Sequence, residues 1–449
     1  MPPTKNNRRK ACLWGMVLIL LMVGGVLYLA HGRLLVPRPD FFLTPIVRRA
    51  SMYSLLLAGA LIVMAILIWS VKHRLNRGFR HALLHARLLS KVEKALLEAG
   101  YYIPEGMGSN KVARLPRLKL TLDNDLTTGV LQLGNHVHFE KPFESICLSS
   151  CLGHFVVDQH YLSDSQNEVI FEISDSREQR QLVFDSAEAF LAHSKQRCGA
   201  YELFIDGKSK IPLFHFLVVG MTGSGKSYAL FSLILQMLGK LVPYHLYFAD
   251  PKMSDLGALG KRIAKENTAE SIEDIIVLLR KVSDELEKRK PVLQERLPEK
   301  HGGTYEDFGF APHIFIIDEF SSFMGFVAKM DKSARDDVAA MLKNIVLQGR
   351  QFGFFLWIVM QKSDASSIPT EIRENLPGKF VLGQSERMTY ETCFGPATAS
   401  KVPNRRYLPG HGVFTFAGIA NMPKLCYFPT LNFDVPEAIA KLSARVPVM

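Results

Sequence analysis

Residues 220–227 read Gly-Met-Thr-Gly-Ser-Gly-Lys-Ser, and this stretch decides the fold of the second half of the chain. It follows the apolar run 213–219 and precedes residues 228–240, which have helical character. The order of strand, glycine-rich loop and helix is that of a phosphate-binding loop, or P-loop. Glycines let backbone N–H groups converge on phosphate oxygens without clashes from Cβ atoms, and the helix N-terminus adds a partial positive charge. The stretch therefore predicts a binding site for ATP.

Two residues of the loop have separate expected roles. Lys226 would reach the β- and γ-phosphates, and Ser227 would ligate Mg²⁺, so ATP and Mg²⁺ are the expected cofactors. The alternative is a chance glycine turn, and both the flanking pattern and a second motif downstream argue against it. The expected ATP-binding residues are Gly220, Met221, Thr222, Gly223, Ser224, Gly225, Lys226, Ser227 and Tyr228.

The second motif is the run 314–319, in which four apolar residues precede Asp318 and Glu319. The apolar residues indicate a strand buried on both faces, and its carboxyl end is where α/β sheets place their ligands. Asp318 fits the Walker-B residue that holds the Mg²⁺ shell, and Glu319 fits the base that deprotonates the attacking water. An acidic cap at a strand end is the alternative. We expect this strand and the P-loop strand to adjoin in the sheet and to support ATP hydrolysis.

From about residue 206 the sequence alternates between strand and helix patterns, which is typical of a parallel sheet. Residues 354–360 read as another buried strand, and Gln361 follows it directly. A polar residue ending a strand beside the Walker-B strand would contact the γ-phosphate and detect its loss; a solvated strand end is the alternative. Ser271 is expected to cap a long helix that Pro291 stops.

Two stretches near the N-terminus, residues 11–30 and 50–71, contain no charged residue. Each would span roughly 30 Å as a helix, the thickness of a bilayer core, and together they predict a transmembrane hairpin. Trp14 and Trp69 would lie at one interface, with Tyr28 and Tyr53 at the other. A signal peptide is the alternative for the first stretch, and a buried core helix for the second.

Positive charge flanks both ends of this hairpin, although its loop is also basic. The balance favours a multi-pass protein of the cell membrane, with the N-terminus and the C-terminal ATPase domain in the cytoplasm, where ATP is available. The chain has 449 residues and a net charge of +11. Anionic lipid near the hairpin and nucleic acid are both possible partners for this charge, and composition alone does not separate them.

The region between the hairpin and the ATPase domain changes pattern twice. A basic amphipathic helix comes first, with Leu84, Leu88, Val92 and Leu96 on one face and Gly100 to close it. It would pack against lipid, a neighbouring subunit or its own domain. Residues 101–205 then show short alternating strands separated by turn formers, which indicates a small α+β adaptor domain. The six cysteines and the scattered histidines lack the spacing of a metal site, and the cysteines fit a reducing compartment.

An ordered series of motifs in residues 206–418 resembles the FtsK/SpoIIIE family of DNA translocases. The series continues after the P-loop and ends at Gly410-His411-Gly412. Its further members are Asp-Pro-Lys-Met at 250–253, Glu-Leu-Glu-Lys-Arg at 285–289, Ile-Asp-Glu-Phe at 317–320, Arg-Gln-Phe-Gly at 350–353, Gln-Lys at 361–362 and Ile-Arg-Glu-Asn-Leu-Pro at 372–377. A P-loop alone would be weak evidence for a family, whereas the ordered series is specific.

The resemblance implies a RecA-like P-loop ATPase that forms a homo-hexameric ring around DNA. It would contact DNA mainly through the phosphate backbone, without sequence specificity. A neighbouring subunit would supply an arginine finger, for which Arg350, Arg373 and Arg387 are candidates. The expected catalytic residues are Lys226, Asp318, Glu319 and Gln361, with Arg350 or Arg387, and the expected metal ligands are Ser227 and Asp318.

The expected domains are a membrane anchor over residues 1–75, the adaptor over 76–205 and the ATPase domain over 206–449. Cell-division members of the family carry a longer membrane region, a long linker and a C-terminal winged-helix domain, and their Gln-Arg-Pro is Gln361-Lys362-Ser363 here. The layout is more similar to TcpA-type coupling proteins of Gram-positive conjugative elements, which implies a relaxase and secretion-channel proteins as partners.

The function that follows is a membrane-anchored, ATP-driven DNA translocase that delivers DNA to a secretion channel. Three alternatives remain open. The first is a DNA pump for chromosome segregation, and the second is a protein-secretion ATPase of the type VII sort. The third is a membrane scaffold for a DNA-processing complex that uses nucleotide only to assemble.

Overall fold

The computed structural model describes residues 4–31, 44–105, 112–135, 148–177, 180–361 and 368–443. The chain forms two compact units, Met1–Glu178 and Gln179–Met449. This division lies upstream of the boundary expected between residues 205 and 206. The reason is that strand β7 (Val183–Phe184) pairs with β18 (Thr430–Leu431), which ties the start of the second unit to its last strand.

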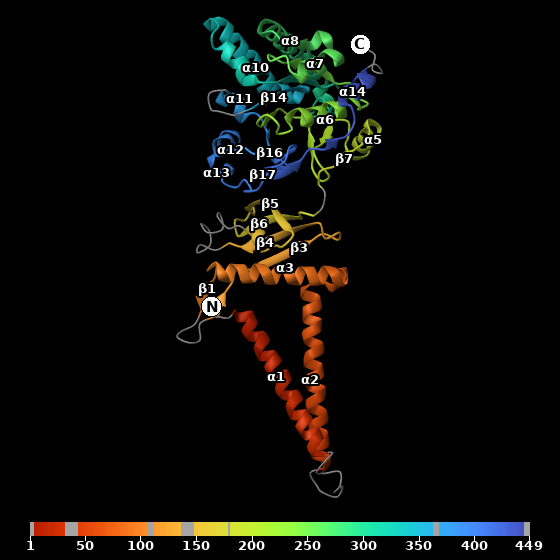
Figure 1. The fold of residues 1–449 in the computed structure, drawn as a ribbon, viewed down its shortest axis with the longest axis vertical. Helices are drawn as coiled ribbons and strands as arrows, with labels where there is room; N and C mark the ends of the chain where they lie inside the picture. The colour runs from red at the N-terminus through yellow and green to blue at the C-terminus, as the bar shows by residue number, and fades with distance from the viewer. Residues whose placement is uncertain are drawn as a thin grey trace. The chain divides into compact units, whose positions relative to one another are not determined.

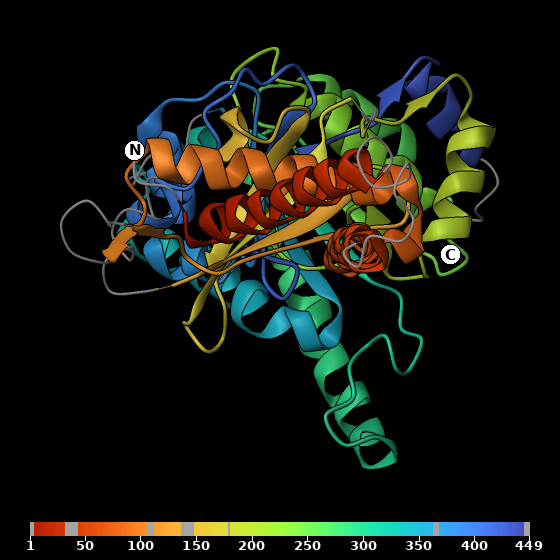
Figure 2. The ribbon, with the colours of Figure 1, turned by 90° about the horizontal axis from the view of Figure 1, so that it is seen from below.

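The first unit begins with two apolar helices, α1 (Lys5–Ala30) and α2 (Thr44–Lys72). Within them, Asn7–Ala30 and Pro45–Lys72 are long and apolar enough to cross a membrane. Ser51 Oγ donates to the Gly24 carbonyl oxygen at 2.9 Å, and Ser54 Oγ donates to that of Leu20 at 2.6 Å. Figure 1 shows the helices closest together near the end of α1 and further apart towards α3, and Figure 2 shows α2 nearly end-on with α1 inclined across it.

The rest of the first unit is an antiparallel sheet with one long helix, α3 (Phe79–Glu98), on it. The sheet order is β3-β4-β6-β5. Leu88, Val92 and Leu96 of α3 belong to the same buried cluster as Leu131 and Phe171 of the sheet. Of the three partners considered for this amphipathic helix, its own domain is therefore the observed one. The strands are β3 (Leu118–Leu122), β4 (Thr128–Gly134), β5 (Phe155–Leu162) and β6 (Glu168–Asp175), beside a two-stranded sheet of β1 (Ile103–Glu105) and β2 (Val112–Arg114) and the short helices η2 (Leu75–Arg77) and η4 (Leu148–Ser150).

The second unit is built on an eight-stranded sheet of order β12-β11-β13-β14-β10-β15-β16-β17. The first six strands are parallel, and the last two run antiparallel to their neighbours. The sheet confirms the expected α/β fold class and adds an antiparallel edge. Its strands are β10 (Phe216–Val219), β11 (His245–Ala249), β12 (Thr268–Ala269), β13 (His313–Ile317), β14 (Phe354–Met360), β15 (Gly378–Leu382), β16 (His411–Phe416) and β17 (Ala420–Tyr427).

Two further strands, β8 (Glu202–Phe204) and β9 (Lys210–Pro212), form a hairpin of their own, and helices complete the unit. The helices are α5 (Ala187–Arg197), α6 (Lys226–Leu238), α7 (Asp255–Ile263), α8 (Ile272–Arg296), α9 (Phe320–Val327), α10 (Lys332–Phe352), α11 (Thr370–Glu374), α12 (Arg387–Phe394), α13 (Pro396–Ala399) and α14 (Val435–Ser443), with short η5 (Lys265–Asn267) and η6 (Leu297–Glu299).

Helix α8 begins as the sequence predicts and ends later. Ser271 Oγ accepts a hydrogen bond from Asp274 N at 3.1 Å, which is an N-cap. Pro291 does not stop the helix, which continues to Arg296. Leu293, in the turn after the proline, is fully buried, so tertiary packing outweighs the local preference of proline to end a helix.

The core of the sheet lies around β14, whose seven residues are all buried. The indole of Trp357 stacks on the ring of Phe216 in the neighbouring β10, with ring centroids 4.0 Å apart. Both faces of this strand are covered, as in other parallel sheets. The result is a rigid centre from which the loops after β10, β13 and β14 leave at the same edge.

Candidate nucleotide-binding site

The loop after β10 has the backbone of a phosphate cradle. Gly223 and Gly225 have φ angles of +80° and +92°. Residues with a Cβ atom rarely adopt such angles. A Cβ at Gly225 would lie 2.4 Å from Gly410 N, and one at Gly220 would lie 2.6 Å from the Leu382 carbonyl oxygen. Glycine is therefore required at two positions because neighbouring backbone passes directly against the loop.

The segment that begins β16 holds this loop from outside. Gly410 N donates to the Ser224 carbonyl oxygen at 2.8 Å. On the other side, Gly220 N donates to the Met360 carbonyl oxygen at 3.2 Å, which joins the loop to the end of β14. The Ser224 side chain is buried, and within the described part of the chain its Oγ has no hydrogen-bond partner. The cradle and this unpartnered hydroxyl both fit a phosphate-bearing ligand.

Lys226, the first residue of α6, is folded back onto its own loop. Its Nζ donates to the carbonyl oxygens of Gly220 and, at 3.2 Å, of Met221. Burial lowers the pKa of Lys226, and the carboxylates of Asp318 and Glu319 act in the opposite direction. The P-loop lysine and the acidic pair are thus close enough to interact electrostatically. By contrast Met221, Thr222, Gly223, Ser227 and Tyr228 are exposed.

Asp318 and Glu319 leave the carboxyl end of β13. Asp318 N donates to the Ala249 carbonyl oxygen at 2.9 Å, and Asp318 Oδ1 accepts from Glu319 N at 2.9 Å. Burial raises the pKa of Asp318 to about 6, with smaller contributions from the charges of Asp250 and Glu319. Glu319 has a left-handed backbone with φ +48°, a strained conformation for a glutamate. This backbone conformation sets the direction in which the Glu319 side chain leaves the main chain.

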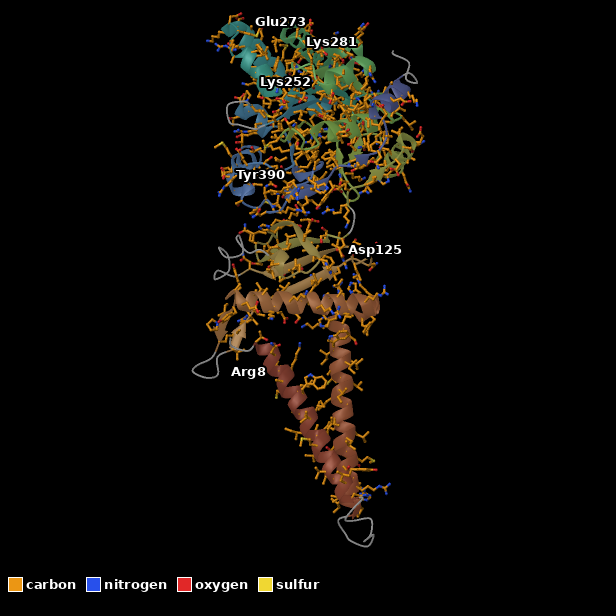
Figure 3. The ribbon with its side chains drawn as sticks, viewed as in Figure 1. Arg8, Asp125, Lys252, Glu273, Lys281 and Tyr390 are labelled. Atoms are coloured by element: carbon orange, nitrogen blue, oxygen red, sulfur yellow. The ribbon has the colours of Figure 1, made fainter. Side chains whose placement is uncertain are left out.

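The loop after β11 contributes residues that contact both Asp318 and Glu319; Figure 3 labels one of them, Lys252. Lys252 Nζ lies 3.1 Å from Glu319 Oε2. Ser254 Oγ lies 3.4 Å from Asp318 Oδ2. The fully buried Asp250 shapes this loop, because its Oδ2 accepts from Ser254 N at 2.7 Å and from Gly257 N at 2.9 Å.

The sequence placed Asp250 and Lys252 in a motif of the family resemblance but predicted no role in the site for them or for Ser254. The signal that would have found them was visible, since Asp250 directly follows a strand and parallel strands bring their carboxyl ends to one edge of a sheet. The missing step was the neighbour relationship of β11 and β13.

One expectation about the sheet was wrong. The P-loop strand β10 and the acidic strand β13 are not neighbours, because β14 lies between them. Gln361, which is exposed, follows β14 and so leaves the sheet between the two motifs. Its contact with a γ-phosphate stays a prediction. Lys362 and Ser363 lie outside the described residues.

The candidate arginine fingers have different surroundings. The Arg350 guanidinium lies 4.0 Å from the ring centre of Phe214, just before β10. Arg387, at the start of α12, is paired with Glu391 at 2.7 Å, and its side chain is 85% exposed. Arg373 of α11 is partly exposed. Arg350 and Arg387 are thus both exposed, and Arg350 in addition packs over an aromatic ring.

A cavity of about 500 Å³ adjoins the start of α6. Ser227, Tyr228 and Phe231 line one side of it, and Leu259 and Arg262 of α7 line another. Asp255 and Asp434 also line the cavity, and its aromatic side chains beside the phosphate cradle fit the nucleoside end of a nucleotide. No group of three or more His, Cys, Asp or Glu residues in the described ranges is placed to hold a metal ion. A Mg²⁺ held mainly by phosphates and water, with Ser227 and Asp318, does not require such a group.

The fold and this loop define a P-loop NTPase. Residues 194–362 match the model of the FtsK/SpoIIIE family, so the chain contains an FtsK/SpoIIIE domain. It is similar to the FtsK domain-containing protein YdcQ of Bacillus subtilis, at 29% identity over 186 residues, covering 41% of this chain and 37% of that protein. It is also similar to the DNA translocase FtsK of Halalkalibacterium halodurans, at 25% identity over 225 residues, covering 45% of this chain and 27% of that protein. The chain thus matches only about a third of these relatives' lengths.

Among solved structures, the chain is similar to the monomer form of the pCW3 conjugation coupling protein TcpA with ATPγS. The identity is 18% and the TM-score is 0.48, over 79% of this chain and 98% of that one.

Proposed function

We propose that this protein is a membrane-anchored ATPase that moves DNA and serves as a coupling protein in conjugation, delivering DNA to a secretion channel. One observation carries the ATPase part of the proposal. The P-loop lysine and two carboxylates from a different strand come together at one edge of the sheet, where both carboxylates act on the pKa of Lys226.

The proposed chemistry uses residues already in place. Lys226 exchanges the two loop carbonyls that it now contacts for oxygens of the β- and γ-phosphates. Ser227 and Asp318 would hold Mg²⁺, which would supply positive charge to neutralise the phosphates. Glu319 accepts the proton of the attacking water, and Lys252 orients its carboxylate. Gln361 contacts the γ-phosphate from the end of β14.

The DNA part of the proposal is supported by the FtsK/SpoIIIE domain match and by the names of the curated relatives. A homo-hexameric ring would place an arginine of one subunit at the nucleotide of the next, with DNA contacted through its phosphates. The two apolar helices support the anchor. The orientation with both chain ends in the cytoplasm, and a relaxase and channel proteins as partners, complete the proposal.

The test is ATP hydrolysis by the full chain in detergent, with and without duplex DNA. We expect stimulation by DNA that is lost as salt is added, because phosphate contacts release counterions. Lys226→Ala abolishes turnover and DNA transfer while membrane insertion persists, and Glu319→Gln retains bound ATP without hydrolysing it. Normal hydrolysis by Glu319→Gln contradicts the base assignment.

Two other outcomes discriminate among functions. Absence of stimulation by any nucleic acid defeats the translocase proposal and favours protein secretion. Retained DNA transfer by Lys226→Ala favours a scaffold that uses nucleotide only to assemble.

A further inference from the structure

The first unit contains a basic cavity where its three long helices meet. Its volume is about 360 Å³. We call it the junction pocket and define it by Lys10 of α1, Trp69 and Lys72 of α2, and Ser90 and Lys94 of α3. Nothing in the proposed ATPase chemistry uses this cavity, which lies in the other compact unit of the chain.

The charges in the junction pocket do not balance within the protein. Three ammonium groups from three different helices line it, whereas Glu93 is the acidic residue in its lining. Lys94 also contacts Glu98 at 3.6 Å, but both side chains are largely exposed and such pairs contribute little. Like charges that share a cavity repel one another unless an anion lies between them.

His73 adds no positive charge of its own to the pocket. Its ring is buried beside the pocket, and its Nδ1 is 3.0 Å from His85 Nδ1. Burial, His85, Lys72 and Lys10, in that order, lower the pKa of His73 to about 4. The histidine is therefore neutral at pH 7, and the three lysines carry the positive charge of the pocket.

The position of the pocket along the helices specifies the kind of anion. Lys10 is near the start of the first apolar helix, and Trp69 and Lys72 end the second. Tryptophan and lysine at the end of a span mark the depth of lipid headgroups. The lining is also partly apolar, since Trp69, Leu89 and Leu97 contribute to it. Basic groups beside apolar ones match a phosphate ester attached to a glycerol and acyl chains.

We propose that the junction pocket binds the phosphate headgroup of an anionic phospholipid of the cytoplasmic leaflet. The headgroup would contact Lys10, Lys72 and Lys94, with Asn7 and Ser90 as neutral hydrogen-bond donors. A lipid bound there joins both spans to α3. This inference rests on the membrane anchoring in the proposed function and is independent of its ATPase and DNA parts.

The test measures lipid preference with the full chain in nanodiscs of phosphatidylcholine containing a minor fraction of phosphatidylglycerol. The protein is then transferred to neutral detergent, and the retained lipids are identified by mass spectrometry. We expect retained phosphatidylglycerol to be enriched over its share in the nanodisc. The combined change Lys10→Gln, Lys72→Gln and Lys94→Gln removes this enrichment, and Lys94→Gln alone reduces it about fivefold, the effect of one lysine near an anionic surface.

The matched control removes the same charge elsewhere on α3. Arg80→Gln, Arg87→Gln and Lys91→Gln change exposed residues that do not line the pocket, and this variant keeps the enrichment. Equal loss in both triple variants shows diffuse attraction and overturns the proposal. Unchanged enrichment in Lys94→Gln overturns it too. Thermal stabilisation of the detergent-solubilised chain by inorganic phosphate alone, equal to that given by phosphatidylglycerol, shows a site for free phosphate and also contradicts it.

Discussion

Lys252 Nζ lies 3.1 Å from Glu319 Oε2, so the residue proposed as the catalytic base is paired with the loop that follows β11. The Glu319 side chain is 9% exposed, whereas that of Lys252 is 46% exposed. A buried carboxylate with one cationic partner is held in one orientation by that partner. We therefore propose that Lys252 positions the Glu319 carboxylate for the hydrolysis step.

We predict that Lys252→Gln lowers kcat about tenfold with little change in KM for ATP, because the lost contact matters for the reaction and not for nucleotide binding. Steady-state ATPase assays check this. Lys281→Gln, an exposed lysine of α8 that Figure 3 also labels, serves as the control and keeps normal kinetics. A rise in KM without a fall in kcat would assign Lys252 to nucleotide binding instead.

The P-loop glycines give a matched pair of substitutions. Gly225→Ala combines a positive φ with a Cβ 2.4 Å from Gly410 N, whereas Gly223→Ala has a positive φ and open space around its Cβ. We expect Gly223→Ala to cost about 1 to 2 kcal/mol of backbone strain. Gly225→Ala must in addition displace the start of β16.

Thermal unfolding and binding of an ATP analogue distinguish the two variants. Gly225→Ala is expected to lose analogue binding and to melt below Gly223→Ala. Equal melting temperatures would show that the contact between the loop and Gly410 does not limit stability.

Asp318 makes stability depend on pH. Its pKa is raised from 3.8 to about 6 in the folded protein, so the folded state binds more protons than the unfolded state between these values. The contribution of this group to stability is therefore lost as pH rises through that window. Asp318→Asn removes the penalty at pH 7, where we expect it to raise the free energy of unfolding by roughly 2 to 3 kcal/mol at most.

Thermal melting of nucleotide-free protein as a function of pH measures this effect. The difference between wild type and Asp318→Asn should be largest near neutral pH and should vanish near pH 4. The variant should also lose ATP hydrolysis, because the buried charge that destabilises the folded protein is the charge proposed to act in the site. A difference that is constant with pH would contradict the raised pKa.

Two of the candidate arginine fingers, Arg350 and Arg387, can be distinguished by how their substitution changes the stability of the protein. Arg350→Ala should lower stability by about 1 kcal/mol, because its guanidinium packs over Phe214. Arg387→Ala should change it by less than about 0.5 kcal/mol, since its pair with Glu391 is exposed. Loss of ATPase activity in Arg387→Ala with unchanged melting would then report catalysis. Full activity in that variant excludes Arg387 as the finger.

Local patterns were sufficient to predict the strands and the helix that build the candidate site. The strand 354–360 matches β14 in both bounds, and the P-loop is followed by a helix as expected. These predictions succeed because a buried run and a glycine-rich loop are specified by residues adjacent in sequence. The amphipathic face of α3 could be predicted for the same reason.

The strand order and the contacts between distant segments could not be predicted from one sequence. The placement of β14 between β10 and β13 depends on crossovers that no local pattern encodes. The contacts of Lys252 with Glu319 and of Gly410 with Ser224 join residues far apart in the chain. Pro291 inside α8 is a case where burial of nearby residues outweighs a local rule.

The pairing of β7 with β18 decides where the second unit can be cut from the chain. Thr430 N donates to the Leu182 carbonyl oxygen and Asn432 N to that of Phe184, both at 2.8 Å. The side-chain amide of the fully buried Gln236 accepts a hydrogen bond from Phe204 N at 2.9 Å and donates one to the Phe204 carbonyl oxygen at 3.0 Å. An expression fragment that starts at residue 206 would leave a sheet edge and a buried amide without partners, whereas one that starts at residue 180 retains them. Soluble material for crystallisation or cryo-microscopy should therefore begin before β7.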